Sequence, residues 1–368
     1  MNFDFSEEQK LLQKTARDYL ADQAPLTLAR AVMESDSKYS EELWKGIAEM
    51  GWLGAAISEQ YGGAGFGHLE LALLAQEVGR SLAPVPFSSS VYQATEAISQ
   101  LGSDEQKQKY LTRLAAGDAI GTLAISEGPG EMNLESVETH YEAGKLTGTK
   151  TAVADGDISD LVVVLAKTAA GTALVVVDGD AGVEKKSLES IDPTRSLGQL
   201  TFDGAPAELL GADGEGAAWA EKILDRAAVL MAFEQIGSAE RAFDITKEYT
   251  LGRYAFGRPI ASFQAIKHRL ADLYTMIVLA TSNAYYGAWA LENEAEELGT
   301  AACAARVSAT EAFDRAGEEI IQMHGGVGFT WEYDCHMFYR RSKLTGLVLG
   351  SAAEWREKLI QRLEAGAI

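Results

Sequence analysis

The order in which hydrophobic patterns change along the chain limits its fold more than any other feature. Between residues 6 and 117, apolar residues recur at helical spacing, as at Leu12, Ala16 and Leu20. The middle of the chain contains short apolar runs bounded by Gly, Asp and Pro, a pattern typical of strands, at 120–125, 161–166, 173–177 and 200–202. From Trp219 onward, long helical runs rich in Ala, Leu and Glu return. The sequence therefore predicts helices, then a β region, then helices.

These changes of pattern divide the 368 residues into three predicted domains. Residues 1–118 form an N-terminal helical domain, 119–215 a middle antiparallel β domain, and 216–368 a C-terminal four-helix bundle. Two helix starts are marked by Ser6 and Ser103, each followed by acidic residues and then a glutamine, as in helix caps. The predicted fold class is α+β, and the length is sufficient for two or three domains.

Composition argues against several kinds of function. The formal net charge of −22 and a pI near 4.7 disfavour nucleic-acid binding, because a phosphate backbone would be repelled. No apolar run approaches the ~20 residues that cross a bilayer, and the N-terminus lacks the pattern of a signal peptide. The two cysteines, Cys303 and Cys335, are far apart and lack metal-ligand spacing. We expect a cytoplasmic protein that binds no metal, membrane or nucleic acid.

Two segments of the C-terminal part carry the pattern of a cofactor site. Residues 321–332 read Ile-Gln-Met-His-Gly-Gly-Val-Gly-Phe-Thr-Trp-Glu and end a helical run. Glycines at such a turn permit close backbone approach, and N–H groups beside a helix end can meet a phosphate. Residues 253–260 read Arg-Tyr-Ala-Phe-Gly-Arg-Pro-Ile and combine an arginine, an aromatic ring and a sharp turn.

Together these segments resemble the two flavin-binding signatures of the acyl-CoA dehydrogenase family. The resemblance covers nearly the whole chain, because segments 51–65, 77–80 and 192–195 also match family signatures. No segment resembles the strand–GxGxxG–helix unit of nicotinamide enzymes. The resemblance implies an acyl-CoA dehydrogenase-like α+β fold and a bound FAD. It also implies an obligate oligomer, since in the family both segments reach the flavin of a neighbouring subunit.

The side chains of both segments agree chemically with FAD binding. Arg253 offers a charged fork to the pyrophosphate, and Phe256 can cover an aromatic ring of the cofactor. Gln264 and Gln322 present amides to the polar edges of adenine or ribose. The cofactor-binding candidates in this part of the chain are Arg253, Phe256, Gln264, Gln322, Gly325 and Gly326. Taken singly, the arginine could instead be a helix C-terminal charge, and the glycines a plain helix cap.

The middle domain departs from the family pattern. The family's Thr-Glu-Pro and Ala-Gly-Ser-Asp elements correspond to residues 124–131, where Ser126 keeps the hydroxyl expected at the flavin and Glu127 is retained. Glu131 stands where a small polar residue is expected, and an acidic group near CoA phosphates is unfavourable. Ala152 occupies the position that usually supplies a flavin-stacking tryptophan. We therefore expect an altered flavin pocket on this side.

The resemblance also implies a catalytic base, which in the family is a glutamate. That glutamate removes an α-proton from the acyl thioester while the β-hydride passes to the flavin. In most members it precedes a glycine about two dozen residues after the His-Gly-Gly motif, where this chain has Leu349. In a second group it lies on the first helix of the C-terminal domain, where this chain has Ala227. Neither position carries a carboxylate.

Three other carboxylates are candidate bases. Glu234 lies two helical turns after Ala227 among apolar residues and is the leading candidate for a base, but its position favours the alternative of a buried structural carboxylate. Asp225 is a reserve that could simply favour the helix dipole. Glu354 fits a solvated helix start. The remaining alternative is that the chain has no base of its own.

Three functions are compatible with these residues. The first is α,β-dehydrogenation of an acyl-CoA thioester by a homotetramer, or by a heterotetramer with a related subunit, with electrons passed to an electron-transfer flavoprotein. The second is a non-catalytic, FAD-completing subunit of a heteromeric acyl-CoA dehydrogenase. Bacterial relatives built from two unlike chains act on bulky acyl groups such as steroid side chains, and residues 328–332 resemble that branch. The third is a flavin monooxygenase or oxidase on the same fold.

Overall fold

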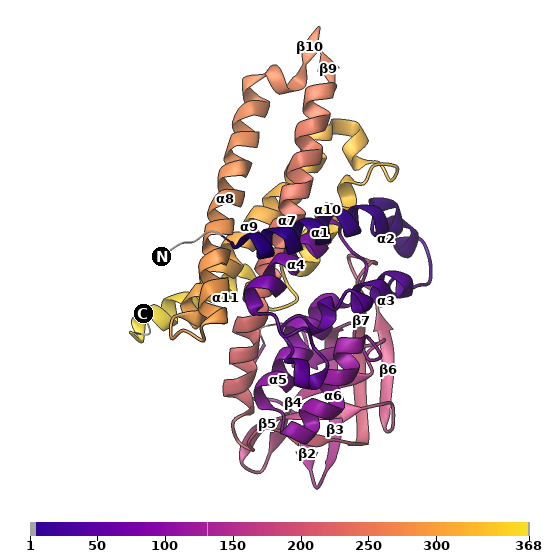
Figure 1. Ribbon diagram of the computed structural model, residues 1–368, viewed down its shortest axis with the longest axis vertical. Helices are drawn as coiled ribbons and strands as arrows, with labels where there is room; N and C mark the ends of the chain where they lie inside the picture. Colours follow the sequence, from indigo (N-terminus) through magenta and orange to yellow (C-terminus); the bar gives the residue numbers. More distant parts are fainter. Residues whose placement is uncertain (1–4, 131, 367–368) are drawn as a thin grey trace. The chain divides into compact units, whose positions relative to one another are not determined.

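The computed structural model describes residues 5–130 and 132–366, and Figure 1 follows them from the N-terminus to the C-terminus. The chain divides into two compact units. Of the described residues, the helical unit contains 5–29, 72–83 and 228–366, and the sheet unit contains 30–71, 84–130 and 132–227.

Among the described residues, three helices run through both units. Helix α2 (Leu26–Met33) begins in the helical unit and ends in the sheet unit. Helix α4 (His68–Arg80) begins in the sheet unit and ends in the helical unit, and helix α7 (Gly216–Gly252) does the same. N-terminal and C-terminal helices thus share one compact unit, although they are far apart in sequence. This grouping follows contacts in space, so the division of the sequence into three domains, with boundaries at residues 118 and 215, remains a proposal.

In the described chain, eight strands form one sheet in the sheet unit. They are β1 (Gly121–Ala124), β2 (His140–Glu142), β3 (Lys145–Ala154), β4 (Leu161–Thr168), β5 (Gly171–Asp178), β6 (Val183–Leu188), β7 (Leu197–Pro206) and β8 (Glu208–Leu210). Seven follow the order β6-β7-β3-β2-β4-β5-β8, and β1 pairs with β4. The pairing is antiparallel except that β1 and β2 run parallel to β4. The predicted α+β class is confirmed.

Valines hold the centre of the sheet together. Val162 lies opposite Val177, and Val164 lies opposite Val175, so β-branched side chains pair across β4 and β5. Phe202 of β7 belongs to the same buried cluster. Strand β6 escaped prediction because its sequence is largely polar and none of its side chains is fully buried. Backbone pairing with β7 supplies the order that its own sequence does not specify.

Short helices complete the sheet unit. They are α3 (Glu41–Glu49), a π-helix (Ser88–Thr95), α5 (Glu96–Leu101) and α6 (Asp104–Ala116). The cap predicted at Ser103 is present, because its hydroxyl accepts a hydrogen bond from the Gln106 N–H at 3.2 Å and the Gln106 side chain accepts one from the Ser103 N–H. The π-helix is buried along its whole length.

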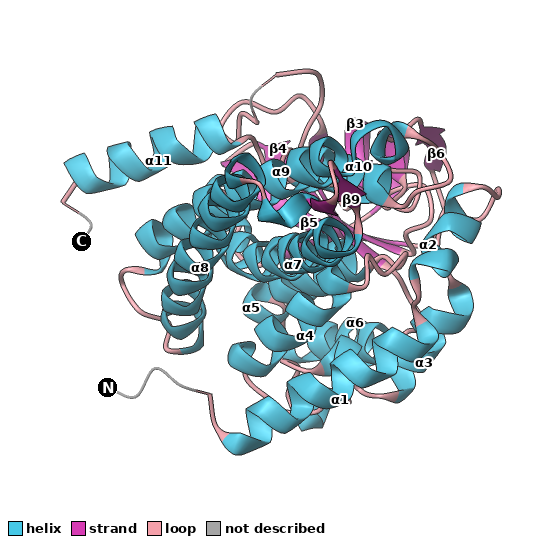
Figure 2. Cartoon of the chain, turned by 90° about the horizontal axis from the view of Figure 1, so that it is seen from above, coloured by secondary structure: helices cyan, strands magenta, loops and turns pink. Residues whose placement is uncertain are grey.

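The helical unit is built around long helices. Helices α8 (Gln264–Glu292) and α9 (Leu298–His324) form an antiparallel pair, which Figure 2 shows together with the second half of α7. Helices α10 (Cys335–Thr345) and α11 (Ala352–Glu364) both pack on α9. Among the described residues, no helix is both long and apolar enough to span a bilayer.

Glycines bring α4 and the second half of α7 unusually close. A Cβ atom added at Gly79 would lie 1.9 Å from the Glu234 carbonyl oxygen, and one at Gly237 would lie 1.8 Å from the Gln76 carbonyl oxygen. The Ser238 hydroxyl bridges the two helices by donating to the Gly79 carbonyl at 2.8 Å. Any larger side chain at these two glycines would force the helices apart.

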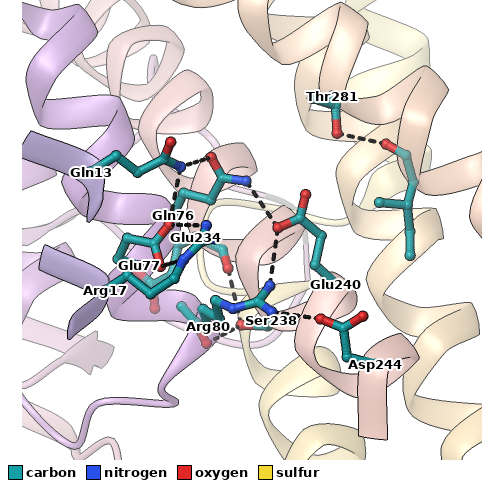
Figure 3. Close-up of polar contacts among 12 residues, drawn as sticks. Gln13, Arg17, Gln76, Glu77, Arg80, Glu234, Ser238, Glu240, Asp244 and Thr281 are labelled. Atoms are coloured by element: carbon teal, nitrogen blue, oxygen red, sulfur yellow. Dashed lines mark hydrogen bonds and ion pairs between the residues drawn. The ribbon is translucent and has the colours of Figure 1, made fainter. Parts of the chain in front are cut away.

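A polar network surrounds this crossing and adds helix α1 (Glu7–Gln23), as Figure 3 shows. The buried Glu77 carboxylate accepts two hydrogen bonds from Arg17 of α1, at 2.7 and 2.9 Å. Arg80 of α4 donates to Asp244 of α7 at 2.5 Å. Because buried charges are tolerated only when paired, these contacts fix which faces of the three helices meet.

Candidate active site and cofactor contacts

A tight hairpin joins α7 to α8 and carries the first predicted cofactor segment. Its strands are β9 (Tyr254–Ala255) and β10 (Arg258–Pro259), and Figure 1 shows them where the two helices end. The turn residues Phe256 and Gly257 have φ values of 54° and 76°, as a type I′ turn requires. A bulky residue rarely adopts this conformation, and the Phe256 side chain is 97% exposed. The turn thus holds an aromatic ring out in solvent.

The other predicted contact residues gather at the same end of the helical unit. Gln264 begins α8 and Gln322 lies in the last turn of α9, so the antiparallel pairing puts both at one end. Arg269 and the buried Glu319 lock these helix ends through two hydrogen bonds of 2.7 and 2.9 Å. The structure therefore brings together side chains from the hairpin and from both helices.

Gly325 and Gly326 follow the C-terminus of α9. Both are exposed, and a Cβ atom built on either would meet no other atom within 4 Å. Gly325 has a φ of 64°, which favours glycine. The dipole of α9 does not attract an anion here, because a helix C-terminus carries partial negative charge. The open approach to the backbone is the feature that suits a ligand.

His324, which precedes these glycines, packs against the end of its own helix and an aromatic ring. Its ring stacks on Tyr249 with centroids 4.0 Å apart, and its Nδ1 lies 2.6 Å from the Ile320 carbonyl oxygen. Burial lowers the pKa of His324, although the Ile320 carbonyl partly opposes that shift. A buried neutral imidazole in this position stabilises the end of α9.

These residues fit the FAD that the family resemblance implies. Within residues 5–130 and 132–366, the side chains of Arg253, Gln264 and Gln322 are exposed and form no hydrogen bond or ion pair with the chain. An unengaged guanidinium and two free amides suit a diphosphate and the polar edges of a nucleotide. Phe256 would cover an aromatic ring, and Gly325 would admit a diphosphate oxygen. When bound, FAD supplies the acceptor for a hydride.

On the sheet unit, Ser126 follows β1 in a braced loop. Its carbonyl accepts a hydrogen bond from the Thr151 N–H at 2.8 Å. The neighbouring Glu127 carboxylate accepts from the fully buried Lys150 ammonium and from the Thr139 N–H, both at 2.8 Å. Burial acts to raise the pKa of Glu127, but these hydrogen bonds and one from the Glu138 N–H lower it to about 2. The retained glutamate thus holds the Ser126 loop.

Ala152 stands at a bulge in β3. The register of β3 against β7 shifts between Lys150 and Val153, and Ala152 in between is exposed with a φ of 53°. A methyl group there leaves open the space that a larger side chain would fill. Glu131, the other predicted departure from the family pattern, lies outside the described residues.

Both positions at which the family resemblance implies a base are buried and apolar. Leu349 is 1% exposed and Ala227 is 0% exposed. Glu354 is occupied in a capping box, where it accepts from the Ser351 N–H while the Ser351 hydroxyl caps the Glu354 N–H. Asp225 is buried in the first third of α7.

Glu234, the leading candidate for the base, lies opposite an arginine. Its carboxylate is 3.8 Å from the Arg341 guanidinium of α10, and each side chain is 1% exposed. Arg341 also donates to the Leu82 carbonyl at 3.4 Å. Figure 3 places Glu234 beside Ser238 at the crossing of α4 and α7. These surroundings favour the alternative of a buried structural carboxylate.

The sequence analysis overlooked two buried polar residues, Arg306 and Gln235. Arg306 of α9 is 0% exposed and donates to the Gln235 amide oxygen of α7 at 3.0 Å. The sequence did hold a signal, because Arg306 is a single cation directly after the run Ala301–Ala305, which contains only alanines and one cysteine. A cation that follows a helical run apolar on all sides is expected to be buried and to need a hydrogen-bonding partner.

The chain belongs to the acyl-CoA dehydrogenase family: residues 6–118 match the family's N-terminal domain and residues 214–363 its C-terminal domain. It is 34% identical to acyl-CoA dehydrogenase IpdE2 of Mycobacterium tuberculosis over 360 residues. That alignment covers 98% of this chain and 97% of IpdE2. Among similar solved structures, a variant of the Tcur3481-Tcur3483 steroid ACAD has a TM-score of 0.90 and 32% sequence identity, and the match covers 98% of this chain and 99% of that chain. The ChsE4-ChsE5 complex from M. tuberculosis also has a TM-score of 0.90, with 29% identity and 99% of each chain covered.

These similarities extend over almost the full length of the chain. They identify an enzyme of the acyl-CoA dehydrogenase type, and family members are flavoproteins that form oligomers.

Proposed function

We propose that this chain binds FAD within an oligomer and takes part in the α,β-dehydrogenation of an acyl-CoA thioester. One observation supports this most directly: Arg253, Phe256, Gln264 and Gln322 are exposed at one end of the helical unit, and the three polar side chains form no hydrogen bond or ion pair with the described residues. Side chains that point away from their own chain suit a cofactor that another chain also contacts. We further propose that electrons pass from this cofactor to an electron-transfer flavoprotein.

The residues at the expected base positions favour a specific version of this function. Leu349 and Ala227 cannot accept a proton, and Glu354 is engaged in a helix cap. Glu234 faces Arg341 in the interior. We therefore propose, as the second candidate, that the chain completes the FAD site of a heteromeric enzyme whose related partner chain supplies the catalytic glutamate.

The relatives suggest the class of acyl group. One similar structure is described as a steroid ACAD, and both similar structures pair two differently named chains. A heterotetramer acting on a bulky acyl-CoA, such as one with a steroid side chain, fits this resemblance. A homotetramer acting on fatty acyl-CoA is the competing version.

The visible absorption spectrum of the chain expressed alone distinguishes the two versions. About one FAD per chain, bleached anaerobically by an acyl-CoA, would support the homomeric dehydrogenase. A colourless folded protein that gains flavin and activity only with a second family chain would support the heteromer. A flavin that no acyl-CoA reduces in either preparation would contradict both. Rapid oxygen consumption during turnover would indicate an oxidase or monooxygenase instead.

A further inference from the structure

The most unusual buried group in the helical unit is the guanidinium of Arg306. It is 0% exposed, and no carboxylate among the described residues forms an ion pair with it. Burial lowers the pKa of Arg306 to about 9, so the group is still protonated at neutral pH. A buried charge without a counter-charge opposes folding, and apolar side chains of similar volume are often at least as stable. Its presence therefore calls for a role beyond packing.

The hydrogen bonds of Arg306 show what it holds. One terminal nitrogen donates to the Thr345 carbonyl at 2.6 Å and to the Gly350 carbonyl at 3.4 Å. The other donates to the Gln235 amide oxygen, which also accepts from the Thr310 hydroxyl at 3.2 Å. The planar fork thus joins the two ends of the 345–350 loop to helices α7 and α9.

The loop's own backbone hydrogen bonds are short-range, such as those from the Gly346 N–H to the Ser342 carbonyl and from the Gly350 N–H to the Leu347 carbonyl, both at 2.9 Å. The loop contains two glycines, Gly350 has a φ of 92°, and the Leu347 side chain is 67% exposed. A second buried donor, the Trp355 indole N–H, binds the Leu349 carbonyl at 2.9 Å. Two buried side chains therefore fix the backbone on both sides of position 349.

We propose that Arg306 is a positioning residue that fixes the 345–350 loop in the conformation needed for acyl-CoA dehydrogenation. The inference rests on the proposed function, because that loop matches the base-carrying segment of the family. The backbone around a functional site must be held to within about 0.5 Å, and short-range hydrogen bonds in a loop with two glycines do not fix it relative to α7 and α9. In this chain the loop is still held by the two buried donors, Arg306 and Trp355, although Leu349 stands where the family resemblance implies a glutamate.

Hydrogen exchange in the assembled, FAD-loaded enzyme tests the positioning role. Arg306→Met removes the charge and the hydrogen-bond donors of the guanidinium. In this variant, amide exchange at residues 346–350 should accelerate at least tenfold, while amides in the middle of α9 stay protected. Arg306→Lys should fall between, since an ammonium cannot span both carbonyls in the same geometry. Arg356→Met is the matched control, because Arg356 joins α11 to Glu311 of α9 at the surface and is 54% exposed. Unchanged exchange in both Arg306 variants would overturn the inference.

A kinetic measurement separates positioning from structural support. In the same complexes, kcat for acyl-CoA should fall at least tenfold in Arg306→Lys, while KM stays within threefold of the parent. A loosened loop with an unchanged kcat would refute the role in the reaction.

If Arg306→Met does not fold, Trp355→Phe removes the other buried donor to the loop and should speed the exchange of the same amides. If the parent complex shows no dehydrogenase activity, the proposed function fails, whereas the exchange data still decide whether Arg306 positions the loop.

Discussion

Glu234 of α7 and Arg341 of α10 form an ion pair in the interior of the helical unit, with their nearest charged atoms 3.8 Å apart and each side chain 1% exposed. Neither group reaches bulk solvent. Because the desolvated arginine depends on the carboxylate for charge compensation, the pair joins α10 to the centre of α7. A carboxylate in this position is poorly placed to exchange protons with a substrate.

The first prediction concerns this pair. Glu234→Gln keeps the shape of the side chain but leaves Arg341 uncompensated, so we expect a loss of about 3 kcal/mol in the free energy of unfolding. Urea denaturation measures it, and Glu49→Gln on the exposed end of α3 is the control. The pH profile of dehydrogenation in the assembled enzyme should keep its shape. Unchanged stability together with a hundredfold loss of rate would instead identify Glu234 as the base.

The second prediction is a gain of function at Leu349. Since the 345–350 loop keeps its buried anchors, Leu349→Glu should place a carboxylate where relatives carry theirs. We expect the FAD-loaded variant to be reduced by an acyl-CoA at least tenfold faster than the parent chain, measured by anaerobic stopped-flow absorbance. Leu349→Gln, which has the same shape without the charge, is the control. Equal rates in the two variants would argue against this placement.

The third prediction concerns stability in acid. Glu96 accepts a hydrogen bond from the Arg226 Nε–H at 2.7 Å, and its carboxylate lies 2.8 Å from His68 Nε2. Burial acts to raise the pKa of Glu96, but His68 and then Arg226 lower it to about 2, from an ordinary value of 4.5. Since the folded pKa is the lower one, this stabilisation is complete above about pH 4.5 and disappears as the pH falls toward 2.

For Glu96 this linkage amounts to about 3 kcal/mol. We expect Glu96→Gln to flatten the dependence of the unfolding free energy on pH between 4.5 and 2. Glu105→Gln, at an exposed glutamate of α6, should leave the slope unchanged. Equal slopes in the parent and in Glu96→Gln would contradict the assignment.

The fourth prediction concerns the crossing of α4 and α7. In Gly79→Ala the added methyl group would lie 1.9 Å from the Glu234 carbonyl oxygen, which only a shift of the helices can relieve. We expect destabilisation by about 3 kcal/mol or more, seen as a lower Tm or as insoluble protein. Gly252→Ala at the end of α7 meets no atom within 4 Å and should be neutral or slightly stabilising. A normal Tm for Gly79→Ala would mean that the helices are less tightly packed.

The fifth prediction concerns the hairpin. Arg253 is exposed, so Arg253→Ala should change the unfolding free energy by less than about 0.5 kcal/mol. The loss of a charge-assisted contact should weaken FAD retention by the assembled oligomer about tenfold, measured by release of flavin fluorescence on dilution. Lys267→Ala, at an exposed cation in the first turn of α8, is the control. Unchanged retention would exclude Arg253 from the cofactor site.

Local signals allowed much of the fold to be predicted from sequence. The Ser6 and Ser103 caps are present, because capping depends on residues within one helical turn. The valine-rich runs of β4 and β5 form strands for a similarly local reason. The polar β6 was not predictable, since only pairing with β7 orders it.

The sequence by itself determined the family and the succession of helical, strand-forming and helical regions, and it predicted the residues that could contact FAD. These depend on short patterns whose meaning is set by backbone conformation and by neighbours in the chain. Only the tertiary structure decided that Glu234 faces Arg341 and that Arg306 has carbonyl groups for partners. A buried charge can be satisfied by any group that packing brings close to it, and those partners lie many helical turns away along the chain.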